Sequence, residues 1–222
     1  AIENLGNFPG IFVDGEEVYI DEKIHGTNCR VGVMLLPRED TGELVPTFVA
    51  GSHSLRRKQF DEKNRPSLYW APLAQEGVEN LLLDLFFQND RQPIIVFGEI
   101  FGAGVQDMQY GQAGKKFRVF DISCNGRYMD SVEKQEILKK HGIEPVPHIY
   151  HGPFSMEKVT ELVDGPTLVC KPEEIKEAFK GREGIVIRPA KERENETIGR
   201  VILKYISVDY HERKNVGRTE DH

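Results

Sequence analysis

The stretch Glu22–Asn28 reads EKIHGTN and separates two segments of β-strand character, residues 17–21 and 30–36. In both segments apolar side chains alternate along the chain, which is the period of a half-buried strand. Lys23 is therefore expected at the end of a strand, where Gly26 lets the backbone turn tightly and approach a ligand. A lysine can act as a nucleophile only as the neutral amine, which requires a nearby positive charge or a metal ion.

Four further motifs supply candidate partners along the chain. They are GEIFG at residues 98–102, FRVFDI at 117–122, EGIVIRP at 183–189 and LKYIS at 203–207. Each lies on or beside a predicted strand and carries one chemically useful residue: Glu99, Phe120, Glu183 and Lys204. A carboxylate can accept hydrogen bonds from sugar hydroxyls, an aromatic ring can stack on a base, and hard oxygen ligands suit Mg²⁺.

Together with Lys23, this set of motifs resembles that of the covalent nucleotidyltransferases, the superfamily of DNA ligases, RNA ligases and RNA-capping enzymes. KxHGTN, GEIFG and FDI are most similar to the RNA-ligase-2-like class. The resemblance runs from Lys23 to Ser207, nearly the whole chain, and the five motifs together are highly specific.

The resemblance implies a role for each matching residue. Lys23 would attack the α-phosphorus of ATP and form a lysyl-AMP phosphoramidate. Glu99 would bind the ribose, Phe120 would stack on adenine, and Lys204 would contact the α-phosphate. Glu183 would bind Mg²⁺ or Mn²⁺. The residues expected to bind the nucleotide are Glu22, Ile24, His25, Gly26, Asn28, His53, Arg56, Glu99, Phe120 and Lys204.

Two positions depart from the family pattern. The family places an arginine shortly after the nucleophile to hold phosphate, whereas here the matching position holds His53, which leaves His53, Arg56 and Arg57 as candidates. The last family motif often carries two lysines one residue apart, but Ile206 occupies the second position, which puts complete charge neutralisation at the phosphate in doubt.

The implied activity is an ATP-dependent RNA ligase that seals RNA ends with a 5′-phosphate and a 3′-hydroxyl through lysyl-AMP and an adenylylated RNA end. The enzymatic alternatives are a DNA ligase and a GTP-using capping enzyme. An alternative of another class is a nucleotide- or RNA-end-binding module with impaired catalysis, since His53 and Ile206 depart from the pattern. One branch of the RNA ligases, the Deinococcus/Naegleria type, carries an OB-type domain before this one. We expect either that such a domain is missing here or that the protein is a stand-alone minimal ligase.

The expected fold class is α+β, with mostly antiparallel sheets, flanking helices and the ATP-grasp-like nucleotidyltransferase fold of the ligase and capping-enzyme superfamily. We expect one domain over residues 1–222 with a frayed tail from 210 to 222. The predicted helices are residues 78–86, 131–141, 155–163 and 172–180, with Ser131 as an N-cap, and 200–206 is predicted as a closing strand.

Composition limits the other possibilities. The net charge of −7 excludes a protein that coats nucleic acid by bulk electrostatics, so any RNA must meet local basic runs such as Arg56–Lys58 and Lys115–Arg118. No apolar run long enough for a membrane helix is present, and we expect a cytoplasmic, intracellular protein. Cys29, Cys124 and Cys170 are far apart in the sequence, which predicts free, buried thiols.

Overall fold

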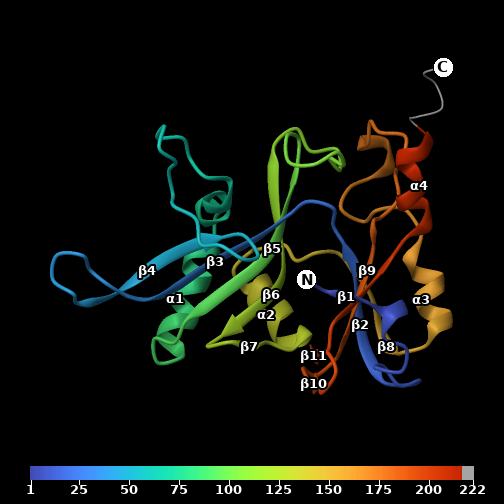
Figure 1. The fold of residues 1–222 in the computed structure, drawn as a ribbon, viewed down its shortest axis with the longest axis horizontal. Coiled ribbons are helices and arrows are strands. Elements are labelled where there is room, and N and C mark those ends of the chain that lie inside the picture. The colour runs from blue at the N-terminus through green and yellow to red at the C-terminus, as the bar shows by residue number, and fades with distance from the viewer. Residues whose placement is uncertain (217–222) are drawn as a thin grey trace. The chain divides into compact units, whose positions relative to one another are not determined.

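The computed structural model describes residues 1–216, which form two compact units. The first unit comprises Ala1–His25, Phe101–Lys115 and the chain from Val146 onward, and the second comprises Gly26–Ile100 and Lys116–Pro145. Each unit is built on a five-stranded sheet (Figure 1). The chain therefore passes from the first unit to the second within the stretch Glu22–Asn28.

The sheet of the first unit has the strand order β1-β12-β9-β2-β8. Its strands are β1 (Glu3–Asn4), β2 (Glu17–Lys23), β8 (His148–Pro153), β9 (Gly184–Pro189) and β12 (Leu203–Ile206). Neighbouring strands are antiparallel except β1 and β12, which are parallel. The other elements of this unit are η1 (Leu5–Asn7), α3 (Met156–Val163), η3 (Pro172–Glu174), α4 (Val208–Val216) and the small hairpin of β10 (Glu194–Asn195) and β11 (Gly199–Arg200).

Strand β2 is fixed by burial. Val18 and Ile20 are fully buried and belong to one apolar cluster that also contains Val159 and Val163 of α3. Full burial of one such aliphatic side chain stabilises a fold by roughly 1.5–3 kcal/mol. This packing and the hydrogen bonds to β8 and β9 hold the end of β2, and with it Lys23, in a defined position.

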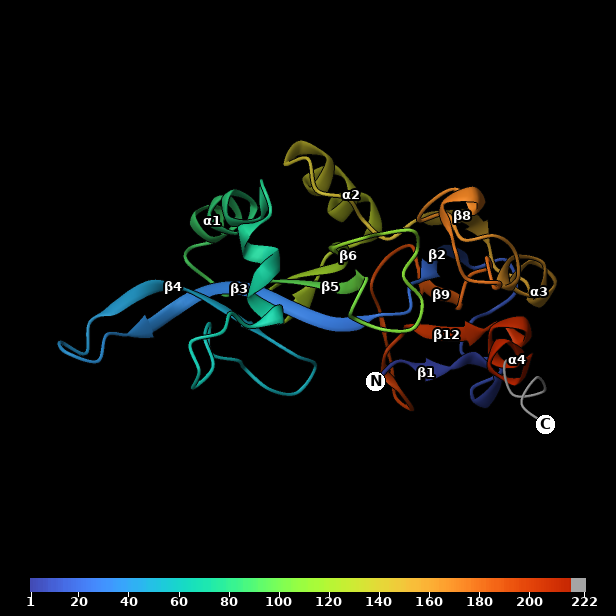
Figure 2. The same ribbon diagram turned by 90° about the horizontal axis from the view of Figure 1, so that it is seen from above.

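The sheet of the second unit has the order β4-β3-β5-β6-β7. Its strands are β3 (Thr27–Pro37), β4 (Leu44–Gly51), β5 (Ile94–Gly102), β6 (Lys115–Cys124) and β7 (Arg127–Tyr128), and its helices are η2 (Leu68–Ala74), α1 (Val78–Gln88) and α2 (Ser131–Lys140). Figure 2 shows α1 and α2 on one side of this sheet and the loop of residues 52–67 on the other.

The α+β class with mostly antiparallel sheets is confirmed, as are three of the four predicted helices. Helix α1 buries the apolar residues that repeat at helical spacing, Val78, Leu81, Leu82, Leu85 and Phe86. In α2 the N-cap is Asp130 rather than Ser131, which is instead the first helical residue and is buried.

The predicted helix over residues 172–180 is wrong beyond its first turn, since only Pro172–Glu174 is helical. Tertiary hydrogen bonds override the helical propensity there: the carbonyl of Lys180 accepts from the backbone of Thr167, and its ammonium donates to the carbonyls of Pro172 and Ile175. The predicted strand over 200–206 is interrupted, because Val201 donates its N–H to Arg193 instead.

The expected frayed tail from residue 210 is also corrected, because α4 occupies Val208–Val216. Tyr210 and Arg213 of this helix make hydrogen bonds to His25 and Asp107 that keep the segment ordered. The remainder of that predicted tail, residues 217–222, lies outside the described residues.

All three cysteines are free thiols, as predicted, but only Cys29 is buried; Cys124 and Cys170 are partly exposed. Among the helices of residues 1–216, none has the length and apolar character needed to cross a membrane.

Candidate active site

Lys23 is the last residue of β2, and Glu183 directly precedes β9, the antiparallel neighbour of β2. In this register Lys23 lies opposite Gly184, and its Nζ is 2.8 Å from Oε1 of Glu183. Position 184 requires glycine, because a Cβ there would lie 2.3 Å from the carbonyl oxygen of Tyr205. The sheet thus joins two residues that stand 160 positions apart in the sequence.

The carboxylate of Glu183 is charged and incompletely satisfied. Burial would raise its pKa, but the polar contact with His25 and the charge and hydrogen bond of Lys23 outweigh burial and hold the pKa below its ordinary value. Its Oε2 is buried and accepts no hydrogen bond within residues 1–216, with Nδ1 of His25 3.6 Å away. A buried, ionised oxygen without a donor is costly unless another partner meets it.

A divalent cation fits this oxygen. In residues 1–216 no three His, Cys, Asp or Glu side chains are grouped to hold a metal ion by themselves. Mg²⁺ needs no such cage, because it is commonly held by one or two carboxylates and completes its shell with water and substrate phosphate oxygens. Glu183 matches this requirement.

His25 is held from three directions. Its backbone N–H donates to the hydroxyl of buried Tyr110 at 2.7 Å, its Nε2 lies 2.6 Å from Oδ1 of Asp107, and its Nδ1 lies 2.8 Å from the hydroxyl of Tyr210. A carboxylate can only accept, so Nε2 carries a proton. The three contacts together fix the orientation of the ring.

Arg213 connects the two partners of His25. Its guanidinium lies 3.2 Å from Oδ2 of Asp107 and 3.7 Å from the centre of the Tyr210 ring. Helix α4 and the loop between β5 and β6 therefore both contact His25, and Arg213 connects them to each other. No motif in the sequence pointed to Asp107, Tyr210 or Arg213.

Two neighbours of Lys23 are turned into the protein. The Glu22 carboxylate accepts hydrogen bonds from the hydroxyl of Thr167 and the N–H of Leu168, and only 1% of Glu22 is exposed. The side chain of Ile24 is also buried. Their predicted place in the nucleotide site stays a prediction, and both side chains have a structural role.

The second unit carries the remaining predicted residues apart from Lys204. Asn28 lies opposite Glu99 in the pairing of β3 with β5, so the two polar side chains are strand neighbours. Oδ1 of Asn28 is buried and has no hydrogen bond in the described part of the chain. Gly26 directly precedes β3, and a Cβ there would lie 2.2 Å from the carbonyl oxygen of Ile100. Backbone packing alone therefore requires glycine at position 26.

The three candidates for the phosphate-holding position are not equivalent. His53 and Arg56 line one small pocket of about 230 Å³ together with Arg30. Arg57 lies outside that pocket and stacks on the ring of Tyr69 instead, 5.5 Å from its centre. The structure thus groups His53 with Arg56 and adds Arg30, which sequence reasoning missed.

Phe120 lies on β6 between buried Val119 and buried Asp121, and is itself only half-buried. Its backbone is fixed by buried Lys134, whose Nζ donates to the Phe120 carbonyl at 3.0 Å. The ring is thus not an ordinary core phenylalanine, and part of it remains available to a flat partner.

In the first unit Lys204 pairs with Val186 of β9, and Ile206 pairs with Gly184. Residues two apart in a strand share a face of the sheet, so Lys204 and Ile206 point to the same side. Ile206, and not Lys204, therefore lies opposite Gly184, the residue that follows Glu183.

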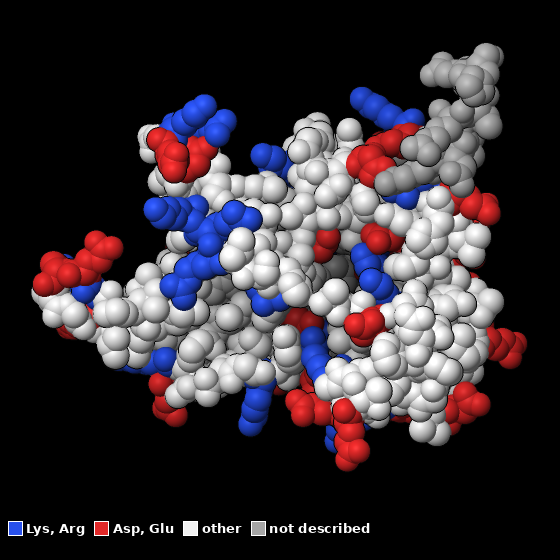
Figure 3. Space-filling model, in the orientation of Figure 1, with Lys and Arg blue, Asp and Glu red and all other residues white. Residues whose placement is uncertain are grey.

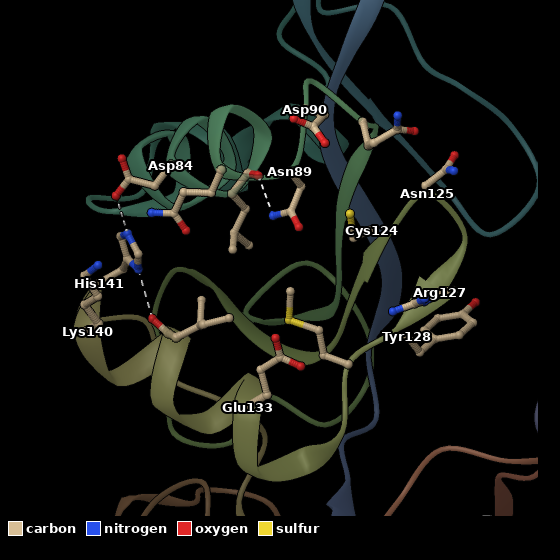
Figure 4. A pocket seen from close by; sticks show the side chains of 15 residues that line it. Asp84, Asn89, Asp90, Cys124, Asn125, Arg127, Tyr128, Glu133, Lys140 and His141 are labelled. Carbon is tan, nitrogen blue, oxygen red and sulfur yellow. Dashed lines mark hydrogen bonds and ion pairs between the residues drawn. The ribbon is translucent and has the colours of Figure 1, made fainter.

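A larger hollow, about 610 Å³, lies in the second unit between α1, α2 and the turn after β6 (Figure 4). His141 bonds Asp84 and the carbonyl of Ile137 at its edge, both at 2.9 Å. None of the predicted site residues lines this hollow. Its lining mixes carboxylates, amides and cations. Its size alone does not make it the reactive site.

The sequence was compared with protein families and with curated proteins. The sequence profile of a family described as RNA ligase matches residues 16–206. Among curated proteins no sequence matches this chain.

Solved structures of an RNA ligase from Naegleria gruberi are similar in fold. A mutant without ligand superimposes with a TM-score of 0.71 at 19% identity and covers 96% of this chain and 56% of its own. Mutants with ATP and Mn and with AMP and Mn give TM-scores of 0.70 and 0.67 at 19% and 18% identity, and each covers 96% of this chain and 57% and 56% of its own, respectively. This chain thus spans a little over half the length of those proteins.

Proposed function

Because the chain belongs to the RNA ligase family, we propose that it is the nucleotidyltransferase part of an ATP-dependent RNA ligase in which Lys23 receives AMP. One observation carries the proposal. The nucleophile candidate lies 2.8 Å from a buried carboxylate, Glu183, whose second oxygen is free for a cation. Such a pair supplies both the attacking amine and the ligand for the ion that neutralises phosphate charge.

In the first step the Lys23 nitrogen forms a bond to the α-phosphorus of ATP. The bond from that phosphorus to the bridging oxygen breaks, pyrophosphate leaves, and the lysine loses a proton. The attacking nitrogen needs its lone pair, so its ion pair with Glu183 has to open. A divalent ion supplies Lewis-acid stabilisation of the phosphate oxygens when bound. Turning Glu183 towards that ion would release the amine.

The other matching residues keep the roles that the resemblance implies for them. Lys204 would contact the α-phosphate, and His53 or Arg56 would hold phosphate oxygens. Glu99 would bind the ribose, and the half-buried ring of Phe120 would stack on the base. Bound ATP in a related fold supports this assignment, since the solved Naegleria gruberi ligase mutant contains ATP and Mn.

In the second step a 5′-phosphate oxygen of an RNA end attacks the phosphorus of lysyl-AMP, which regenerates Lys23 and leaves the RNA end adenylylated. In the third step a 3′-hydroxyl attacks the 5′-phosphorus, a phosphodiester bond forms and AMP leaves. We assign His25 to the nucleotide site rather than to a proton transfer. We also propose that an OB-type domain accompanies this one and that the protein is intracellular. The greater length of the solved relatives supports the companion domain.

Intact-mass spectrometry after incubation with ATP and Mg²⁺ or Mn²⁺ tests the proposal. The protein should gain one AMP, whereas Lys23→Ala and Lys23→Arg should gain none, because only a correctly placed primary amine gives the phosphoramidate. Lys176→Arg, a conservative change at an exposed lysine, is the matched control. An undiminished adduct in the Lys23 variants would refute the assignment. No adduct with the unaltered protein would favour a binding module, and a GTP adduct would favour a capping enzyme.

A further inference from the structure

The loop of residues 52–67 is a positively charged surface on an acidic protein. We call it the basic loop; it contains five cationic and two acidic residues, a net charge of +3, whereas the whole chain carries −7. Every residue from 53 to 66 is exposed. In Figure 3 blue side chains, with red ones among them, gather over this loop, which Figure 1 shows in teal after β4.

Internal hydrogen bonds give the basic loop a defined shape. Oδ1 of Asp61 accepts from the backbone N–H groups of Lys63 and Arg65, both at 2.9 Å, and Phe60 forms a bridge with Pro66. Asn64 adopts a left-handed conformation, with φ of 58°, that closes the turn. A preformed loop loses less conformational entropy when it binds a partner than a flexible one.

Four of the five cations of the basic loop have no acidic partner among the described residues. Arg56, Arg57, Lys58 and Lys63 form no ion pair with a carboxylate of residues 1–216, whereas Arg65 is paired with Asp61 at 2.7 Å. Arg57, Lys58 and Lys63 border a hollow of about 710 Å³ that is also lined by Asp61, Glu62, Phe60 and Tyr69. Cations without internal partners beside a hollow are free to meet an anionic ligand.

Aromatic rings lie beside these cations. Phe60 remains 46% exposed, so part of its ring is open to a flat partner. Tyr69 is covered on one side by the Arg57 guanidinium, and Trp70 donates its ring N–H to the Arg57 carbonyl at 2.8 Å. The hollow therefore combines flat apolar surface with positive charge.

We propose that this hollow is a binding site for single-stranded RNA, with Lys58 and Lys63 on phosphates and Phe60 stacked on a base. Cations that follow the backbone and aromatic rings that receive splayed bases are the two features by which proteins bind unpaired strands. A duplex hides its base faces and would leave Phe60 without a role. An acidic peptide would use the cations but not the ring. That the strand is RNA, and not DNA, rests on the proposed function.

Fluorescence anisotropy with a labelled, 5′-phosphorylated oligouridylate tests the proposal on the full chain. Phe60→Ala should weaken binding about fivefold or more, since removal of one base stack costs about 1–3 kcal/mol. Lys58→Gln with Lys63→Gln should make the slope of log K against log salt shallower by about 1.4, at about 0.7 for each phosphate that the protein no longer neutralises. The charge-matched control is Lys139→Gln with Lys140→Gln, two exposed lysines of α2 on the other side of the sheet (Figure 2).

Equal affinity for a blunt RNA duplex with no effect of Phe60→Ala would overturn the single-strand proposal, as would tighter binding of a glutamate-rich peptide. AMP transfer to Lys23 is measured on the same samples. If the adduct forms but the loop variants bind oligouridylate unchanged, the surface proposal fails and the proposed function stands. If no adduct forms while the loop variants lose binding, the proposed function fails and the strand-binding site stands.

Discussion

The hydroxyl of Tyr210 lies 2.8 Å from Nδ1 of His25, although 185 positions separate them in the sequence. Through this contact α4 reaches the stretch that contains the nucleophile candidate. The same histidine contacts Asp107, and Arg213 joins Asp107 to Tyr210. We infer that Tyr210 is a positioning residue for His25.

Tyr210→Phe should therefore slow lysine adenylylation by about two- to tenfold, the equivalent of removing one neutral hydrogen bond of about 0.5–1.5 kcal/mol. Without the hydroxyl the His25 ring keeps its contact with Asp107 but loses the one at Nδ1, so its orientation is held less firmly. Single-turnover formation of the AMP adduct measures the rate. Glu212→Gln, at an exposed position of the same helix, is the control, and an unchanged rate would exclude the positioning role.

Glu183→Gln should reduce the rate of adduct formation by about 100-fold or more, as expected when one preorganised electrostatic contact to a transition state is removed. The amide keeps the shape of the side chain but loses the charge that attracts a cation. ATP affinity should change much less, because the ion acts mainly on charge that develops during transfer. Equal losses of rate and affinity would contradict a catalytic metal role.

Removal of the divalent ion gives an independent check of the same site. EDTA should suppress the adduct in the unaltered protein, and added Mn²⁺ should restore it. Glu173→Gln, which alters an exposed glutamate, should respond to both treatments like the unaltered protein. An adduct that forms equally well in EDTA would exclude the ion from the transfer step.

Protein stability should depend on pH through Glu183. Its folded-state pKa is lowered, so its stabilising contribution is complete above the unfolded value of about 4.3 and is lost as the pH falls through the lower folded value. Urea unfolding of the unaltered protein and of Glu183→Gln measures this contribution as a difference in free energy. The difference should be larger at pH 7 than at pH 3, and one that does not change with pH would refute the shift.

RNA sealing should be far more sensitive to salt than adenylylation. Lysine adenylylation requires the nucleotide site alone, whereas sealing requires a hold on RNA phosphates, and each phosphate contact adds to the salt dependence. The acidic chain offers few contacts besides the basic loop and Lys115–Arg118. We therefore expect poor sealing at physiological salt, measured with a labelled 5′-phosphate RNA. Robust sealing there would point to a self-sufficient ligase.

Much of the fold and both members of the Lys23–Glu183 pair could be predicted from sequence. Alternation placed Lys23 at the end of a strand, and the motif at Glu183 came just before another. What joined them is the antiparallel register of β2 with β9, which a single sequence does not encode locally.

The partners of His25 could not be predicted, for the same physical reason. Asp107 stands in a glycine-rich segment that reads as a plain loop, and Tyr210 and Arg213 stand in a polar stretch that reads as a frayed end. Their value arises only from contacts across more than 80 positions of the chain. The false helix over residues 172–180 shows the converse, since a good local pattern yields there to the non-helical hydrogen bonds of Lys180 with Thr167, Pro172 and Ile175.

Gly26 and Gly184 are required because they have no side chain. A Cβ at Gly26 would come within 2.2 Å of the Ile100 carbonyl oxygen, and one at Gly184 within 2.3 Å of the Tyr205 carbonyl oxygen. A saturation mutagenesis screen would therefore score both positions as intolerant as Lys23, although neither supplies a functional group. Their alanine variants would be lost from the soluble fraction, whereas Lys23 variants would remain folded and inert. Activity alone cannot separate these two kinds of essential position.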